Sequence, residues 1–235
     1  MMSEPFVACE RARVVPDEAI NVIETAGNRP FFLNLWYYTV HSPIQAPESL
    51  IDQYRALKPG RHHKDPTYAA MVTRMDHNVG RVLAKLDEMK LSDRTVVVFV
   101  SDNGGVDFDQ RSILPTSNYP LRSGKGTLYE GGIRVPLLIR WPGAPSGETH
   151  ELTTSQDLFN TFTEMLGAPV PKDDSENEGT SLTPLLRDAN GQLPKRSLYW
   201  HFPHYYPRMT PASAIRAGDW KLIHYYEDDR RELYN

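Results

Sequence analysis

A carboxylate and an amide stand side by side directly after an apolar run, where they could bind a metal ion. Asp102 and Asn103 follow the run "VVVFVS" and precede Gly104 and Gly105. Carboxylate and amide oxygens are hard ligands that suit Ca²⁺ or Mg²⁺, whereas Zn²⁺ prefers nitrogen and sulfur. The two glycines have no side chain, so the backbone can turn tightly there and approach an ion. The same residues could also form a plain Asx turn at the end of a strand.

Two further side chains could act on an anionic ligand. Lys125 lies between two glycines in "SGKG", where its ammonium group could meet an anionic oxygen. His41 lies in "TVHSP", just after another apolar run, and histidine can exchange protons near neutral pH. Taken alone, each is more often an ordinary solvated side chain. The single cysteine, Cys9, excludes an internal disulfide.

The elements that must position these residues form an α/β pattern. The apolar runs 30–38 and 94–101 predict strands buried on both faces. Between them, apolar residues recur at helical spacing over 66–89 and predict a long amphipathic helix. This order predicts a parallel βαβ unit. Ligands of open parallel sheets gather outside the carboxyl ends of the strands, where the Asp-Asn pair and the loop histidine lie.

The rest of the chain predicts a second, smaller layer. Further elements are a helix over 15–28, a loop over 105–132, a strand over 133–143, a helix over 155–166 with a Thr154–Asp157 capping box, and a solvated acidic linker over 171–179. Short alternating segments follow, with a hairpin turn at Ala217–Asp219. We therefore expect a core domain over 1–175 and an antiparallel subdomain over 176–235.

Composition excludes several classes of partner. The net charge is −4 and the basic residues do not cluster, so no nucleic-acid or membrane-surface partner is expected. No run of about 18 apolar residues occurs, so no membrane span is expected. The first 15 residues lack a basic start followed by an apolar stretch, so no secretory signal is visible.

Taken in order, several segments resemble the sulfatase family of the alkaline-phosphatase-like superfamily. They are "PFFLNLWYYTVHSP", "YAAMVTRMDHNVGRVL", "VVVFVSDNGG", "LRSGKGTLYEGGIRVPLLIRWPG", "SQDLFNTFTEMLGAPVP", "GTSLTPLL", "LYWHFPHYYPR" and "SAIRAGDWKLI…ELYN". The resemblance covers almost the whole chain from about Pro16. It implies a partial alkaline-phosphatase-like sandwich, with a mixed, mainly parallel sheet flanked by helices and a small C-terminal antiparallel sheet.

The resemblance also implies a sulfuric ester hydrolase and roles for five residues. Asp102 and Asn103 match half of the family's divalent-metal ligands, with calcium as the usual ion and magnesium the lesser alternative. Lys125 matches the lysine that holds a sulfate oxygen. His41 matches the histidine credited with protonating the leaving alcohol, and His201 sits where relatives often contact substrate. The implied substrate is a small sulfate ester or a sulfated glycan.

The sequence departs from the family at its nucleophile. Relatives carry a C/S-x-P/A-x-R motif that is converted to formylglycine; these residues contain none, and Cys9 in "ACERAR" does not fit. The paired aspartates that complete the metal site are also absent. We therefore expect a C-terminal fragment that does not hydrolyse sulfate esters alone. We also expect uncovered strand edges that favour self-association.

Two alternatives stay open at this point. A phosphonate or phosphodiester hydrolase of the same superfamily shares the Asp-Asn pair and similar strands. A degenerate, non-catalytic domain could bind sulfated glycans or act as a structural partner, and the missing nucleophile supports that interpretation. Family members are commonly exported, but these residues leave the compartment open.

Overall fold

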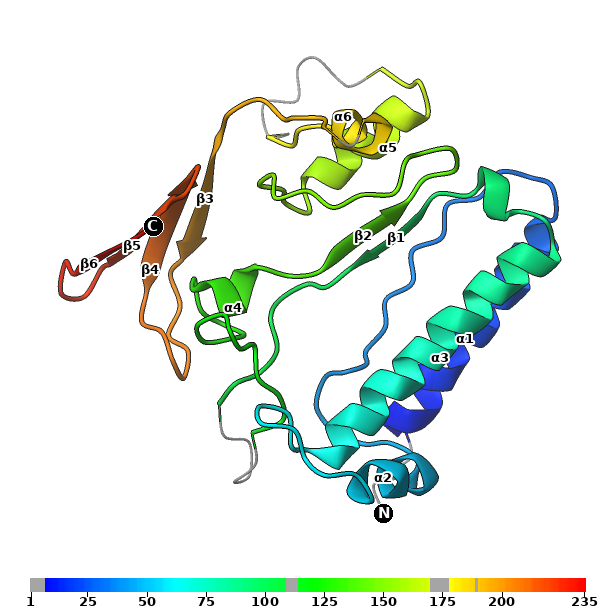
Figure 1. Ribbon diagram of the computed structural model, residues 1–235, viewed down its shortest axis with the longest axis horizontal. Coiled ribbons are helices and arrows are strands. Elements are labelled where there is room, and N and C mark those ends of the chain that lie inside the picture. Colours follow the sequence, from blue (N-terminus) through cyan, green and yellow to red (C-terminus); the bar gives the residue numbers. More distant parts are fainter. Residues whose placement is uncertain (1–6, 109–113, 170–177, 189) are drawn as a thin grey trace. The chain divides into compact units, whose positions relative to one another are not determined.

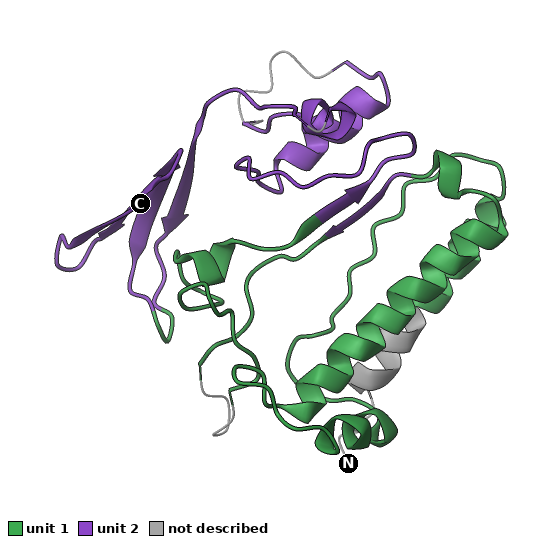
Figure 2. Cartoon of the chain, viewed as in Figure 1, with its two compact units in different colours: residues 1–95, 100–137, 206–208 green, residues 96–99, 138–205, 209–235 purple. Residues whose placement is uncertain are grey.

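The computed structural model describes residues 7–108, 114–169, 178–188 and 190–235, with only the backbone of residues 7–14 (Figure 1). The chain divides into two compact units (Figure 2). Unit 1 comprises Met1–Thr95, Val100–Leu137 and Tyr206–Arg208, and unit 2 comprises Val96–Phe99, Leu138–Tyr205 and Met209–Asn235. The expected boundary near residue 175, and most of the acidic linker, lie outside the described residues. None of the described helices is long and apolar enough to cross a membrane.

Two long helices form the apolar core of unit 1. Helices α1 (Val7–Ala26) and α3 (Pro66–Glu88) pack side by side in the same direction (Figure 1). The core residues are Ala19 and Ile23 on α1 and Ala70, Met71, Val82 and Leu86 on α3. Ion pairs flank this contact, and Lys85 Nζ lies 2.8 Å from Glu24 Oε1. The short helix α2 (Glu48–Arg55) also packs on α3.

The prediction of a long helix from residue 66 is confirmed. Asp65 caps α3, because its Oδ1 accepts hydrogen bonds from the backbone N–H groups of Thr67 at 2.8 Å and Tyr68 at 3.3 Å. Pro66 follows at the first helical position, where its missing N–H costs nothing. Cap and apolar period lie within one short segment, so both can be read from the sequence.

The N-terminal helix begins earlier than predicted. We expected a start at residue 15, with Pro16 in the first turn, but α1 begins at Val7 and contains Pro16 in its interior. The proline ring is fully buried, and this packing offsets the backbone hydrogen bond that proline cannot donate. Gly27 ends the helix as expected, with φ +57°.

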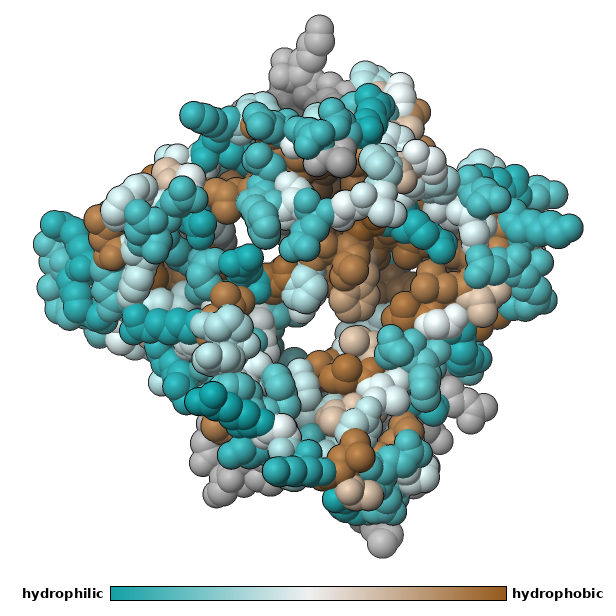
Figure 3. Space-filling view, in the orientation of Figure 1, coloured by the Kyte–Doolittle hydropathy of each residue, from teal (hydrophilic) through white to brown (hydrophobic). Residues whose placement is uncertain are grey.

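The prediction of a fully buried strand over 30–38 is wrong. The segment is neither helix nor strand, and it pairs with no strand among the described residues. Phe32 and Trp36 are 78% and 82% exposed, and they contribute to the apolar surface of the molecule. Apolar patches are also visible among polar ones in Figure 3. A strand requires a partner, so the parallel βαβ unit is not formed here, and self-association through this surface stays a prediction.

Strands β1 (Val97–Val100) and β2 (Leu137–Arg140) form a two-stranded sheet at the two other predicted positions. Two backbone hydrogen bonds continue the pairing beyond β1. Ser101 N–H donates to Pro136 O at 3.3 Å, and Gly104 N–H donates to Gly132 O at 2.9 Å. From the first bond to the second, the residue number increases from 101 to 104 on one segment and decreases from 136 to 132 on the other, so the two segments run antiparallel. The described strands therefore do not confirm a mainly parallel sheet.

Unit 2 contains the small antiparallel sheet that the sequence predicts. Strands β3 (Ser197–Phe202), β4 (Ala212–Ala217), β5 (Trp220–Tyr225) and β6 (Arg231–Tyr234) pair in chain order. The predicted hairpin turn joins β4 to β5, and its Gly218 has φ +57°. The sequence analysis missed β6, which is only four residues long. One face of the sheet is buried through Ala212, Ala214 and Ile223.

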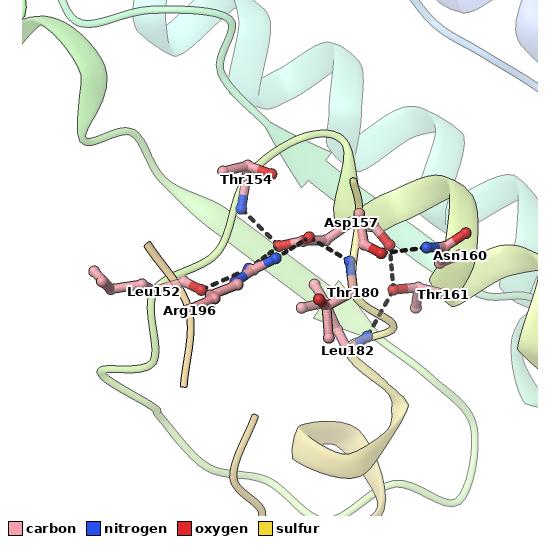
Figure 4. Close-up of polar contacts among 9 residues, drawn as sticks. Leu152, Thr154, Asp157, Asn160, Thr161, Thr180, Leu182 and Arg196 are labelled. Atoms are coloured by element: carbon pink, nitrogen blue, oxygen red, sulfur yellow. Dashed lines mark hydrogen bonds and ion pairs between the residues drawn. The ribbon is translucent and has the colours of Figure 1, made fainter. Parts of the chain in front are cut away.

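A buried ion pair holds together the helical part of unit 2 (Figure 4). Asp157, at the start of α5 (Asp157–Met165), is 0% exposed, and Arg196 contacts both of its carboxylate oxygens, at 2.7 and 2.5 Å. The same carboxylate accepts the backbone N–H groups of Thr154 at 2.7 Å and Thr180 at 2.8 Å. Of the two hydrogen bonds of the predicted capping box, the structure shows the one from the Thr154 N–H to the Asp157 side chain. Arg196 also donates to Leu152 O at 2.7 Å.

Further contacts join α5 to the segment before α6 (Thr183–Arg187). Thr161 Oγ1 donates to Asp157 O at 2.6 Å and accepts the N–H of Leu182 at 2.8 Å, while Asn160 Nδ2 donates to Gly179 O. Thr161 and Leu182 are both buried (Figure 4). One network therefore fixes segments that are far apart in the sequence.

This network predicts an acid-sensitive unit 2. Burial would raise the pKa of Asp157, but the hydrogen bonds from Arg196 and from the backbone of Thr180 and Thr154 outweigh it and hold that pKa below its usual value. A lowered pKa in the folded state stabilises the protein above the unfolded value of about 4, and this stabilisation is lost as pH falls through the folded value. We expect the stability gap between wild type and Asp157→Asn to narrow below about pH 4. Thermal unfolding between pH 7 and pH 3 measures that gap, and a constant gap would contradict this assignment.

Candidate functional site

The loop after β1 and the segment before β2 meet in unit 1. Lys125 N–H donates to Gly105 O at 3.0 Å, and Gly104 N–H donates to Gly132 O at 2.9 Å. Gly131 N–H in turn donates to Arg122 O at 2.9 Å. The glycine-containing motif "DNGG" therefore lies against "SGKG" and "EGG", which come about 20 residues or more later in the sequence.

Glycine is required in this contact because backbone packs on backbone. A Cβ placed on Gly104 would lie far closer than 3.0 Å to Gly131 O, and one on Gly124 would overlap Gly105 O in the same way. Real Cβ atoms essentially never come so close to another atom. The sequence analysis expected these glycines to approach an ion. The structure gives them a different partner, the neighbouring loop.

Asp102 and Asn103 form a local turn that leaves two oxygens open. Asp102 Oδ1 accepts the N–H of Asn103 at 2.9 Å, and Asn103 Nδ2 donates to Gly104 O at 2.9 Å. Because the amide nitrogen is used, Asn103 Oδ1 remains an acceptor. Neither Asp102 Oδ2 nor Asn103 Oδ1 has a partner in the described part of the chain. The turn and the metal-ligand interpretations are therefore compatible.

These oxygens suit a hard divalent cation, but they are only part of a ligand set. Among the described residues, no group of three or more His, Cys, Asp or Glu side chains could hold a metal ion. Hard cations such as Ca²⁺ take six to eight oxygen ligands. Asp102 and Asn103 fit such an ion by donor type, and further ligands would have to complete the site.

Lys125 is held by its backbone while its amine stays available. Its N–H is bound to Gly105, and the turn around it is fixed by Thr127, whose buried hydroxyl donates to Gly124 O at 2.8 Å. The side chain of Lys125 is half-buried, and no acidic side chain within the described ranges pairs with its amine. A cationic group of this kind can bind an anionic oxygen.

His41 is exposed and bound only to its own loop. Its Nδ1 lies 2.9 Å from Ser42 O, and its ring centroid lies 5.1 Å from that of Tyr38. A carbonyl oxygen can only accept, so Nδ1 donates the hydrogen and Nε2 is the free nitrogen. Among the described residues, no contact joins His41 to Lys125 or to the Asp-Asn pair, so its role stays a prediction.

His201 belongs to unit 2. It lies on β3, where its Nδ1 is 2.8 Å from the hydroxyl of Tyr226, and that hydroxyl also contacts Ser213 Oγ. His201 faces solvent from this position. Its contact with substrate stays a prediction.

The sequence analysis missed Asn118. Its Oδ1 accepts the N–H of Gly105 at 2.9 Å, and its Nδ2 donates to Gly105 O and Ser123 O, each at 2.9 Å. The surrounding "SNYP" indicates only a turn, because an Asn followed by Tyr-Pro is an ordinary loop signal. The bridging role becomes visible only when the two loops are seen together.

Comparison with known families identifies the chain. The family model "Sulfatase" matches residues 10–168, more than half of the sequence. The chain belongs to the sulfatase family. A second model, "N-sulphoglucosamine sulphohydrolase, C-terminal", matches residues 123–235. Membership implies a divalent metal cofactor, and the donor types of Asp102 and Asn103 agree with that implication.

Similar proteins extend this assignment. A "Sulfatase" of Formosa agariphila is 37% identical to this sulfatase chain over 226 residues, which cover 88% of the chain and 40% of the relative. Human arylsulfatase A is 34% identical over 196 residues, covering 83% of the chain and 36% of the relative. The sulfatase chain thus spans less than half the length of these curated relatives.

Solved structures share the fold. Ps i-CgsB, which has also been solved with k-i-k-neocarrahexaose, superposes on 95% of the sulfatase chain with a TM-score of 0.80 at 31% identity, over 48% of that protein. BT4656, solved with its substrate D-glucosamine-2-N,6-O-disulfate, covers 73% of the chain with a TM-score of 0.54 at 30% identity, over 34% of that protein. These comparisons confirm the family resemblance and the α/β fold with a small C-terminal antiparallel sheet.

Proposed function

We propose that this sulfatase-family protein hydrolyses sulfate esters when a nucleophile that these 235 residues do not contain is supplied, and that unit 1 holds the sulfate group beside a metal ion. The observation that carries the proposal is the hydrogen bond from Lys125 N–H to Gly105 O, 3.0 Å long. It brings the loop of an unpaired lysine against the loop of the Asp-Asn pair. A cationic side chain and two hard oxygens then belong to one small region of backbone.

The chemistry of a sulfate ester suits these groups. Its non-bridging oxygens carry negative charge, which a lysine ammonium and a metal ion can stabilise. We propose Ca²⁺ for this ion, because Asp102 and Asn103 supply oxygen ligands only, and Ca²⁺ accepts irregular oxygen sets more readily than Mg²⁺. When bound, the cation would polarise the sulfate oxygens.

His41 and His201 take the remaining proposed roles. When the imidazole ring of His41 is protonated on both nitrogens, Nε2 can deliver its proton to the leaving oxygen, a transfer that suits histidine near neutral pH. For His201, on the exposed side of β3, we propose a contact with substrate, as the family resemblance implies. The residues do not fit the family's formylglycine, because the sequence contains no C/S-x-P/A-x-R motif.

A sulfated saccharide is the proposed substrate class. Two of the similar structures were solved with carbohydrate ligands, and one of these ligands is a sulfated sugar named as its substrate. Exposed aromatic and polar side chains on β3, such as Tyr199 and His201, are of the kinds that contact sugars. The mainly parallel sheet of the family stays a prediction for the whole protein.

Binding of an aryl sulfate tests the proposal. In the presence of Ca²⁺, Lys125→Ala should weaken binding of p-nitrophenyl sulfate about tenfold or more, because a hydrogen bond to a charged group is lost. Titration followed by NMR measures the affinity. Lys195→Ala, which removes an exposed lysine in unit 2, should leave it unchanged. Equal affinity of wild type and Lys125→Ala would contradict the proposed role.

The same titration separates the phosphodiester alternative. Methyl p-nitrophenyl phosphate carries a single negative charge like the sulfate, so charge alone does not favour either ligand. Tighter binding of the phosphodiester than of the aryl sulfate would favour a phosphonate or phosphodiester hydrolase. Binding of sulfated sugars with no hydrolysis by any longer form of the protein would favour a non-catalytic domain.

A further inference from the structure

We propose that Asn118 is a positioning residue that fixes the Lys125 loop against the Asp102–Asn103 loop. Its side-chain amide makes three hydrogen bonds, each 2.9 Å long, to Gly105 N, Gly105 O and Ser123 O. A carboxamide has two N–H donors and one acceptor oxygen. Asn118 therefore uses its full donor set and its oxygen on backbone groups of these two loops.

The partners of Asn118 place it between the two functional loops. Gly105 lies two residues after Asn103, and Ser123 lies two residues before Lys125. Gly105 O accepts from both Asn118 Nδ2 and the Lys125 N–H, at 2.9 and 3.0 Å. The carbonyl oxygen of Gly105 thus links the side chain of Asn118 directly to the backbone of Lys125.

The side chain of Asn118 packs closely against two glycines. A Cβ on Gly124 would lie 2.6 Å from Asn118 Nδ2, and a Cβ on Gly105 would lie 3.2 Å from Asn118 Oδ1. Gly124 is buried. The two glycines therefore admit the amide, and a longer side chain such as Gln would not reach the same three partners.

The three hydrogen bonds of Asn118 form a bridge between the two loops, and this bridge does not depend on the proposed function. The inference that the bridge positions Lys125 beside a metal ion does rest on the proposed function. Two readouts separate these statements. Amide hydrogen exchange reports the bridge, and Mn²⁺-induced broadening of NMR signals reports the position of Lys125 relative to a bound divalent ion. Mn²⁺ is a suitable probe, because carboxylate, carbonyl and water oxygens bind it.

Asn118→Asp and Asn118→Ala test the bridge in the full 235-residue chain. The Asp variant keeps the acceptor for Gly105 N–H, loses both donors and adds a charge. The Ala variant loses all three bonds without adding charge. We expect the Lys125 amide to exchange about tenfold faster or more in both variants, and the Gly105 amide to do so in the Ala variant, which removes its acceptor. Asn160→Asp is the matched control, because it removes a similar Nδ2-to-carbonyl bond, to Gly179 O, in unit 2 and should leave both amides unchanged.

Wild type alone also tests the bridge, even if a variant fails to fold. The side-chain NH₂ protons of Asn118 and the Gly105 amide should exchange about tenfold more slowly than in an unprotected peptide. Exchange at the unprotected rate would overturn the bridge. So would variants whose Gly105 and Lys125 amides exchange as in wild type.

The second readout tests positioning. In wild type, Mn²⁺ should broaden the amide signals of both Gly104 and Lys125, and in both Asn118 variants the broadening at Lys125 relative to Gly104 should fall several-fold. A merely structural role would leave this ratio unchanged, which would overturn the positioning assignment. If Mn²⁺ broadens neither signal in wild type, the metal site of the proposed function fails, and the exchange results still decide the bridge.

Discussion

Asp157→Ala should lower the free energy of unfolding of unit 2 by about 3–5 kcal/mol. The substitution removes the partner of a guanidinium whose side chain is only 15% exposed, so a buried charge is left without compensation. The backbone N–H groups of Thr154 and Thr180 lose their acceptor as well. Urea unfolding followed by tryptophan fluorescence measures this change, because three of the four tryptophans, Trp141, Trp200 and Trp220, lie in unit 2.

An exposed aspartate in the same unit provides the control. Asp229 also pairs with an arginine, Arg231, at 2.8 Å, but its side chain is 67% exposed. Exposed ion pairs contribute little to stability, so Asp229→Ala should change the unfolding curve far less. A comparable loss in both variants would show that burial of the Asp157 ion pair is not the cause.

Gly104→Ala should lower the free energy of unfolding of unit 1 by about 2–3 kcal/mol, because the added methyl group meets the backbone oxygen of Gly131. The backbone of Gly131 cannot move aside for the methyl group in the way that the end of a flexible side chain could. The two loops must therefore separate, and the Gly104–Gly132 hydrogen bond of 2.9 Å should be lost with them. Far-UV circular dichroism during urea unfolding reports the change, since unit 1 contains the long helices α1 and α3.

Gly80→Ala is the matched control, because the same methyl group there should have the opposite effect. Gly80 lies within α3, and a Cβ at that position would meet nothing within 4 Å. Alanine is a better helix former than glycine, so stability should rise by about 0.5–1 kcal/mol. If Gly104→Ala were tolerated as well as Gly80→Ala, the close packing of the two loops would be disproved.

The elements predicted correctly are those whose sequence features and stabilising contacts lie within one short segment of the chain. Helix α3 was predicted from its apolar period, and the aspartate cap and proline that the structure shows at its start lie in the same segment. The β4–β5 hairpin was predicted from Gly218 between alternating residues. Segment 30–38 failed because a strand depends on its neighbours, and an apolar run says nothing of whether a partner is present. The antiparallel contacts beside β1 are likewise a tertiary property.

The site was predictable by residue type but not by arrangement. Oxygen ligands at Asp102 and Asn103 and a cation at Lys125 follow from their chemistry, and the family resemblance alone supplied the link between them. The bond between Lys125 and Gly105 joins residues 20 positions apart, which no periodic pattern encodes. Asn118 was missed for the same reason, since its partners are set by how two loops pack.

Two hydrogen bonds join Gly105 to Asn118, and they have a consequence for how this family could diversify. The chain between them begins and ends at points that are already joined, so its length can change at a small entropic cost, which grows only slowly with loop size. Insertions or deletions there would change the surroundings of Lys125 without shifting the lysine itself. New substrates could then be acquired by altering this one segment while the anion- and cation-binding groups stay as they are.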